Sequence, residues 1–124
     1  MATSSLPERL GIDLAAIDAM LESVVESDEE LPRGSIVYES IIDLIRAGGK
    51  RLRPIMVIVG GRFGDASLAG KVMRTAALFE YIHMASLIHD DIIDNSDTRL
   101  GRPALHVRTN VRTALHVANY MMAR

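Results

Sequence analysis

Apolar residues recur along the chain at the spacing of an amphipathic helix. Near the N-terminus, Leu14, Ile17 and Leu21 lie three and four residues apart, with acidic residues between them. Because residues at this spacing share one face of a helix, the pattern predicts a helix over residues 14–26 with its acidic face in water.

Capping residues and helix breakers predict two further helices in the first half of the chain. Ser35 is a favourable N-cap for a helix that ends at the glycine pair 48–49. Pro54 suits the first turn of a short helix over residues 55–63, and the apolar sequence of that helix predicts burial.

The second half predicts one long helix and one helix at its end. The long helix starts after Ser67, continues to about Asp94 and is much longer than an average helix. A turn that contains Gly101 and Pro103 separates it from a last helix over residues 112–124, which no stop signal follows. Apolar side chains of this last helix are expected to be exposed, among them Leu115, Val117, Met121 and Met122.

Signals for β-strands are weak. No segment alternates apolar and polar residues, and the Asn-Gly and Asp-Gly pairs that favour tight hairpins are absent. No internal repeat or long linker divides the chain. The predicted fold class is therefore all-α, with residues 1–124 forming one helical unit.

Composition is that of an ordinary globular protein, with 48% hydrophobic and 24% charged residues among 124. No apolar run approaches the roughly 18 residues of a transmembrane helix. The chain has no cysteine and no basic, apolar leader, so a cytoplasmic location is predicted. Residues 98–124 carry five arginines and no acid, but only five aromatic residues occur in the whole chain, which argues against nucleic-acid binding.

Three aspartates close to the end of the long helix are the first candidate for chemistry. Asp90 and Asp94 lie about 40° apart around a helix and Asp91 about 100° from Asp90, so all three are expected on one side. Such a cluster is destabilising without a cation, and carboxylate oxygens suit Mg²⁺. The alternative is that the acids are solvated or pair with arginines such as Arg99 and Arg102.

The segment between the second and third helices is the second candidate. Three cations, Lys50, Arg51 and Arg53, follow two glycines and precede the start of a helix, where anions are favoured. The segment lacks the pattern of a P-loop. It predicts a phosphate-binding turn, and the alternative is a helix C-cap followed by solvated basic residues. Together the two candidates suggest a site for diphosphate groups.

Three segments in succession resemble the trans-isoprenyl diphosphate synthases. They are GGKRLRP at residues 48–54, EYIHMASLIHDDIID at residues 80–94 and TRLGRPALH at residues 98–106. The resemblance covers nearly the whole chain in order and spacing, and it is greatest to the group formed by component 2 of the heptaprenyl diphosphate synthases.

The resemblance implies the N-terminal part of an isoprenoid synthase helical bundle around a deep cavity. It implies a prenyltransferase that uses Mg²⁺ to ionise an allylic diphosphate, such as farnesyl diphosphate, and joins it to isopentenyl diphosphate. It also implies a homodimer, or a heteromer with a second synthase subunit. An apolar cavity would keep water from the carbocation.

The resemblance also assigns roles to residues. Asp90, Asp91 and Asp94 match the first aspartate-rich motif, which binds Mg²⁺ and provides catalysis, and Arg99 matches an arginine that contacts the allylic diphosphate. The diphosphate of isopentenyl diphosphate is assigned to three further side chains, Lys50, Arg53 and His83.

Product length is assigned by resemblance to the residues just upstream of the aspartates. Ala85 and Ser86 are small, which favours a long product of C30 to C35, while Phe79 and Ile82 deeper along the helix could limit it.

Two departures and one missing motif qualify these roles. Leu100 stands where the family has a second arginine, and Asn119 stands where it has an aspartate. The second aspartate-rich motif of the family does not occur in this sequence, so the chain is expected to hold half of a site and to be a poor catalyst alone. The alternative function is a non-catalytic partner or regulatory subunit of a complete synthase.

Overall fold

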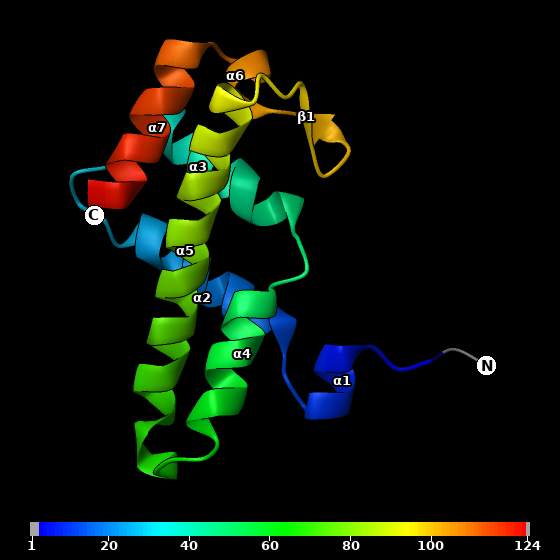
Figure 1. The fold of residues 1–124 in the computed structure, drawn as a ribbon. Helices are drawn as coiled ribbons and strands as arrows, with labels where there is room; N and C mark the ends of the chain where they lie inside the picture. Colours follow the sequence, from blue (N-terminus) through cyan, green and yellow to red (C-terminus); the bar gives the residue numbers. More distant parts are fainter. Residues whose placement is uncertain (1–2, 124) are drawn as a thin grey trace.

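The structure, a computed structural model, describes residues 3–123, most of which are helical (Figure 1). The α-helices are α1 (Leu6–Leu10), α2 (Leu14–Glu26), α3 (Ile36–Ala47), α4 (Leu52–Gly61), α5 (Ala69–Ile93), α6 (Leu105–Arg108) and α7 (Val111–Ala123). A 3-10 helix, Ala66–Leu68, precedes α5, and a hairpin of β1 (Thr98–Arg99) and β2 (Arg102–Pro103) follows it. The prediction of an all-α fold is confirmed.

The long helix α5 is the centre of the fold. In Figure 1, α4 lies beside its N-terminal half and α7 beside its C-terminal half, and all three of α2, α4 and α7 pack on it. Ile17, Ile41, Ala85 and Val117, from four different helices, are fully buried in one core. Burial of these apolar side chains is the main stabilising term of the fold.

Local capping fixes the ends of α2 and α3 where the sequence predicts them. The Asp13 carboxylate accepts a hydrogen bond from the Ala15 amide at 3.0 Å, and the Ser35 hydroxyl accepts one from the Tyr38 amide at 3.2 Å. Helix α3 ends at Gly48. Each cap satisfies an amide that has no partner within its helix.

The acidic face of α2 is not simply solvated, contrary to prediction. Glu22 accepts from Arg46 on α3 at 2.8 Å, and Asp18 accepts from Arg51 at 2.9 Å. The periodicity of α2 places these acids outside the core, but it carries no information about cations that approach from other segments.

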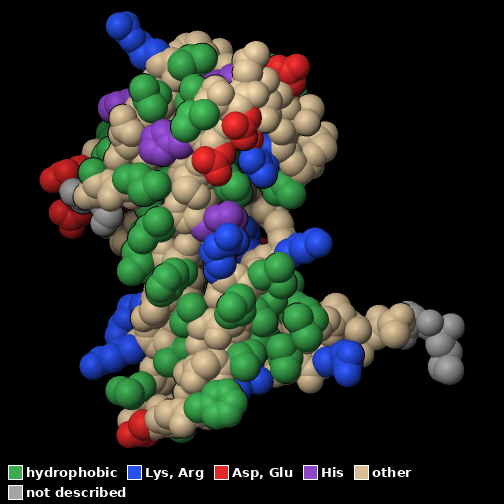
Figure 2. All heavy atoms as spheres, in the orientation of Figure 1, with side chains coloured by type: hydrophobic (Ala, Val, Ile, Leu, Met, Phe, Trp, Pro, Cys, Tyr) green, Lys and Arg blue, Asp and Glu red, His purple; other side chains and the backbone are tan. Residues whose placement is uncertain are grey.

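Helix α4 differs from the prediction in both its start and its burial. It begins at Leu52, so that Pro54 lies at the third helical position, and only Pro54 and Ile55 are buried. Met56 is 72% exposed, and Phe63, beyond the end of the helix, is 90% exposed. Helix α4 packs on α5, and hydrophobic side chains gather on the surface of the molecule over α4 (Figure 2).

The turn around Gly101 is part of a β-hairpin that the sequence does not predict. Leu100 and Gly101 form its two-residue loop with φ angles of 54° and 73°, and Arg99 pairs with Arg102 across the strands. Two successive positive φ angles define the tight hairpin turn that Asn-Gly usually forms. Because Leu100 takes the first loop position, where asparagine is usual, the sequence does not indicate this turn.

Helix α7 exposes only part of its predicted apolar surface. Leu115 and Met122 are 42% and 46% exposed, whereas Val117 and Met121 are buried against α5, so the prediction is wrong for these two. Arg124, the last residue of the predicted helix, lies outside the described residues. None of the helices described is long and apolar enough to cross a membrane.

Candidate functional site

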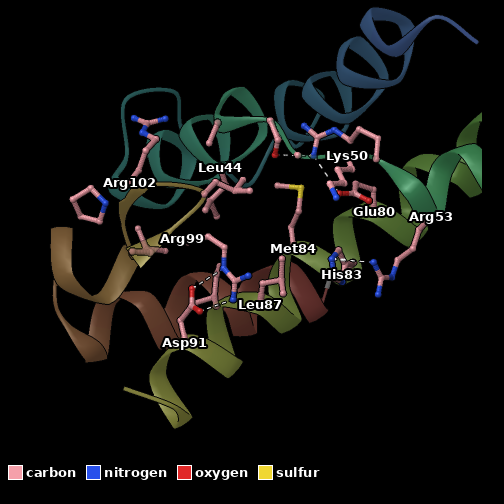
Figure 3. Close-up of a pocket in the computed structure, with 18 of the residues that line it drawn as sticks. Leu44, Lys50, Arg53, Glu80, His83, Met84, Leu87, Asp91, Arg99 and Arg102 are labelled. Atoms are coloured by element: carbon pink, nitrogen blue, oxygen red, sulfur yellow. Dashed lines mark hydrogen bonds and ion pairs between the residues drawn. The ribbon is translucent and has the colours of Figure 1, made fainter. Parts of the chain in front are cut away.

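A pocket of about 380 Å³ opens between the α3–α4 turn, the C-terminal half of α5, and the hairpin with α6 (Figure 3). Its charged and histidine side chains are Lys50, Arg51, Arg53, Glu80, His83, Asp91, Arg99, Arg102, His106 and Arg108. Apolar side chains such as Leu44, Met84 and Leu87 form the rest of the wall. Because cations outnumber carboxylates, the pocket favours an anionic ligand.

The α3–α4 turn carries the predicted cations into this pocket. Gly48 and Gly49 have φ angles of 84° and 140°, a region that glycine occupies without strain. Lys50 is exposed and has no side-chain partner among residues 3–123. Arg53 lies in the first turn of α4 and reaches His83 on α5, with 3.1 Å between Nη1 and Nε2 (Figure 3). The structure thus brings Lys50, Arg53 and His83 to one pocket.

Burial and the adjacent Arg53 guanidinium lower the pKa of His83 below its usual value of 6.5. The ring is therefore neutral at neutral pH. Since a guanidinium can only donate, Nε2 accepts the hydrogen bond from Arg53 and the proton lies on Nδ1. The pair thus offers the pocket the Arg53 cation and the Nδ1–H donor of a neutral His83 ring.

On the opposite side of the pocket, Arg99 forms a two-point ion pair with Asp91 (Figure 3). Nη2 lies 2.5 Å from Oδ1 and Nε lies 3.1 Å from Oδ2. The Asp91 side chain is 7% exposed and that of Arg99 is 36% exposed. Hydrogen bonding to Asp91 raises the pKa of Arg99 above its already high normal value, and charge-assisted pairs of this geometry are among the stronger polar contacts.

The three aspartates lie within the predicted arc of the helix but differ in burial. Asp90 and Asp94 are exposed, and neither lines the pocket, whereas Asp91 is buried. Asp91 continues the buried stripe of α5 that includes Tyr81, Met84 and Ile88.

No group of three or more acidic, histidine or cysteine side chains is arranged to hold a metal ion within residues 3–123. The donor type nevertheless fits Mg²⁺, which takes one or two carboxylates together with phosphate oxygens and water. Asp90 and Asp94, one helical turn apart and both in solvent, provide such carboxylates.

The two residues assigned to product length lie outside the pocket lining. Ala85 is fully buried in the core. Ser86 is partly exposed, and its hydroxyl donates to the His83 carbonyl at 2.6 Å.

Arg51 and Glu80 complete the charged wall of the pocket. Glu80 has no predicted role, whereas Arg51 is one of the three cations of the predicted phosphate-binding turn and differs from the other two because it is buried in ion pairs. Arg51 is 4% exposed and pairs with Glu80 on α5, which is 5% exposed. The spacing of Glu80, three residues before His83, places both on one face of α5 and could have indicated its position. The hairpin and α6 add two more arginines, Arg102 and Arg108, and Arg108 pairs with Asp43 at 3.5 Å.

Comparison with known proteins identifies relatives of this chain. Component 2 of heptaprenyl diphosphate synthase from Geobacillus stearothermophilus is 43% identical over 115 residues, which cover 93% of this chain and 34% of that protein. The protein of the same name from Bacillus subtilis is 40% identical over 114 residues, which cover 92% of this chain and 31% of that protein. The chain thus spans about a third of the length of these relatives.

Solved structures share the fold. The crystal structure of heptaprenyl diphosphate synthase from Staphylococcus aureus matches with a TM-score of 0.79 and 31% identity, over 89% of this chain and 33% of that one. A decaprenyl diphosphate synthase from Rhodobacter capsulatus matches with a TM-score of 0.74 and 34% identity, over 95% of this chain and 35% of that one. The fold is therefore the N-terminal part of an isoprenoid synthase bundle. The model of the polyprenyl synthetase family matches residues 35–124, and the chain belongs to that family.

Proposed function

We propose that this chain forms the first part of the active site of a polyprenyl diphosphate synthase. The synthase would condense isopentenyl diphosphate with an allylic diphosphate such as farnesyl diphosphate. The observation that carries the proposal is the pocket of excess positive charge, which joins the basic turn to the end of α5 and the hairpin. The basic turn with His83 lies on one side of the pocket and Arg99 on the other, and two such groups suit two diphosphate substrates.

Lys50, Arg53 and His83 form the proposed subsite for isopentenyl diphosphate. Lys50 has no protein partner among the described residues to give up, and Arg53 has only the neutral His83 ring. A diphosphate therefore gains both cations without breaking an ion pair. The neutral ring orients Arg53 while it adds no charge of its own.

The allylic diphosphate is proposed to bind at Arg99 with Mg²⁺. Asp90 and Asp94 would hold the metal in the arrangement seen here, and Asp91 would join them once Arg99 exchanges that carboxylate for the diphosphate. Bound Mg²⁺ would stabilise the negative charge that develops on the departing diphosphate.

A long product of C30 to C35 remains the proposal for chain length. Ala85 is buried in the core, so the proposed product length is supported by Ser86, which is the partly exposed member of the pair. The same side of α5 exposes Phe79 by 52% and Ile82 by 44%. By resemblance these two side chains would limit the growth of the product, although neither lines the pocket in this structure.

The chain spans about a third of its curated relatives, so the complete reaction requires more than the residues seen here. Those relatives are named as component 2 of a synthase. We therefore propose that the whole protein acts as a homodimer or together with a second synthase subunit, and that this chain alone is a weak catalyst.

Inorganic pyrophosphate is the direct probe of the proposed site. Titration calorimetry of the full chain without metal should show binding that Arg53→Gln weakens by roughly tenfold, because one charged contact is lost. Arg74→Gln is the matched control, since Arg74 is exposed on α5 and does not line the pocket. Equal affinity for the two variants would refute the assignment.

Mg²⁺ provides the second arm of the same titration. Adding the metal should raise the affinity of the wild-type chain for pyrophosphate, and Asp91→Ala should reduce this gain. Identical gains in the two proteins would exclude Asp91 from the metal site while leaving the metal-free pyrophosphate site intact.

A further inference from the structure

Arg51 is a buried cation between two residues of the proposed diphosphate site. Its side chain is 3% exposed, whereas Lys50 and Arg53 on either side of it are exposed. Charged side chains are almost never buried to this extent unless all their donors are satisfied. The contacts of Arg51 therefore indicate what the residue does.

The Arg51 guanidinium binds acceptors from three helices. Nε donates to Asp18 on α2 at 2.9 Å, and Nη1 donates to Glu80 on α5 at 3.2 Å. Nη2 donates to the carbonyl of Ile45 in the last turn of α3 at 2.7 Å. These contacts fix the α3–α4 turn against α2, α3 and α5 at once, with the planar fork that only arginine offers.

The backbone of Arg51 is also unusual. Its φ of 53° lies in the left-handed region, which residues other than glycine rarely occupy. Arg51 is the N-cap residue of α4, and its side chain makes no capping hydrogen bond. Such a conformation persists only where surrounding contacts hold it. The three contacts of the guanidinium supply that restraint, and this conformation sets the direction in which α4 leaves the turn.

Two parallel contacts then join the turn to α5. Arg51 pairs with Glu80 in the interior, and Arg53 pairs with His83 in the pocket. Glu80 and His83 lie three residues apart on one face of α5. The buried contact between Arg51 and Glu80 therefore also fixes the distance between the turn and α5 at which Arg53 reaches His83. Figure 3 shows both side chains of α5 beneath the turn.

We propose that Arg51 is a positioning residue, which keeps Arg53 directed at the diphosphate pocket without touching the ligand itself. The proposal rests on the proposed function of that pocket. It predicts that loss of the Arg51 contacts weakens diphosphate binding through Arg53, even where the fold survives.

The test is a double-mutant cycle on pyrophosphate affinity in the full chain. Arg51→Met alone leaves Glu80 buried without a partner and can unfold the chain, so the main variant is Arg51→Met with Glu80→Leu. Replacement of a buried ion pair by apolar side chains is often neutral for stability. Arg46→Gln is the control, because Arg46 makes an Arg–Glu pair to α2 and does not line the pocket.

The expected result is that the Arg51 and Glu80 variant binds pyrophosphate roughly tenfold more weakly, with a melting temperature close to that of the wild type. Adding Arg53→Gln to it should cause little further loss, since the two changes act through one contact. The control should bind as the wild type does. A purely structural role of Arg51 would not produce this lack of additivity.

Four outcomes would overturn the proposal. Wild-type affinity in the Arg51 and Glu80 variant, or full additivity with Arg53→Gln, would refute the role of Arg51 while the pocket assignment stands. No pyrophosphate binding by the wild-type chain would refute the pocket assignment and the role of Arg51 together. Should the double variant unfold, Asp18→Asn, which alters a half-exposed partner of Arg51, must show the same lack of additivity, and additive losses would refute the role.

Discussion

The ion pair between Asp91 and Arg99 gives a quantitative prediction about stability. Asp91→Asn keeps the size of the side chain and removes its charge, so that Arg99 loses both charge-assisted hydrogen bonds at 2.5 and 3.1 Å. The new amide can still accept one hydrogen bond from the guanidinium. The substitution therefore isolates the charge from the packing.

The expected loss follows from how exposed each partner is. Removing one partner of a fully buried pair costs about 3–5 kcal/mol, and an ordinary hydrogen bond to a charged group contributes about 1.5–3 kcal/mol. The Arg99 side chain is 36% exposed and can recover hydration, which lowers the cost. We expect a loss of about 1–2 kcal/mol, or roughly 4–8 °C in melting temperature for a chain of this size.

Thermal unfolding followed by circular dichroism at neutral pH provides the measurement. Asp90→Asn is the matched control, because Asp90 is the adjacent aspartate, is exposed and forms no ion pair among the described residues. It should melt within about 2 °C of the wild type, since surface substitutions change stability little. Equal melting temperatures for the two variants would show that the Asp91–Arg99 contact contributes nothing to the fold.

Two further predictions concern the pocket. The pKa of His83 is lower in the folded chain than in the unfolded chain, so the unfolded chain binds more protons as the pH falls. The contribution of neutral His83 to the free energy of unfolding is therefore present above pH 6.5 and is lost as the pH falls toward the pKa of His83 in the folded chain. His83→Gln should accordingly lose less stability than the wild type between about pH 7.5 and about pH 5.5, and an equal loss would contradict the assignment. Leu100 lines the pocket and is 57% exposed, so Leu100→Arg adds a cation and should tighten pyrophosphate binding by roughly tenfold. Calorimetry that shows unchanged affinity would place residue 100 outside the site.

Features that depend on nearby residues were predictable from the sequence. The starts of α2 and α3 depend on caps in which Asp13 and Ser35 reach amides two and three residues away. The long helix α5 follows from an apolar pattern without breakers. The grouping of Lys50, Arg53 and His83 at one site does not follow from nearby residues but is implied by the resemblance to the synthase family, and the pocket contains all three.

Features that depend on distant residues were not predictable. Helix α4 begins at Leu52, ahead of the start suggested by Pro54, where Arg51 is held by partners 29 and 33 residues away in the sequence. The hairpin forms around a leucine with a positive φ, at a position where sequence rules expect asparagine or glycine. In both cases tertiary contacts outweigh the local preference of the residue.

The aspartates show how a correct helical angle can still mislead. Their spacing places Asp90, Asp91 and Asp94 within about 100° of one another, but an arc of that width can cross the boundary between the buried and the exposed face of a helix. Ala77, Tyr81, Met84 and Ile88 mark the buried stripe of α5, and Asp91 is its next member. A carboxylate on that stripe requires a partner, and the hairpin supplies Arg99. This difference in environment is why Asp91→Asn and Asp90→Asn should differ in stability although the two residues are adjacent.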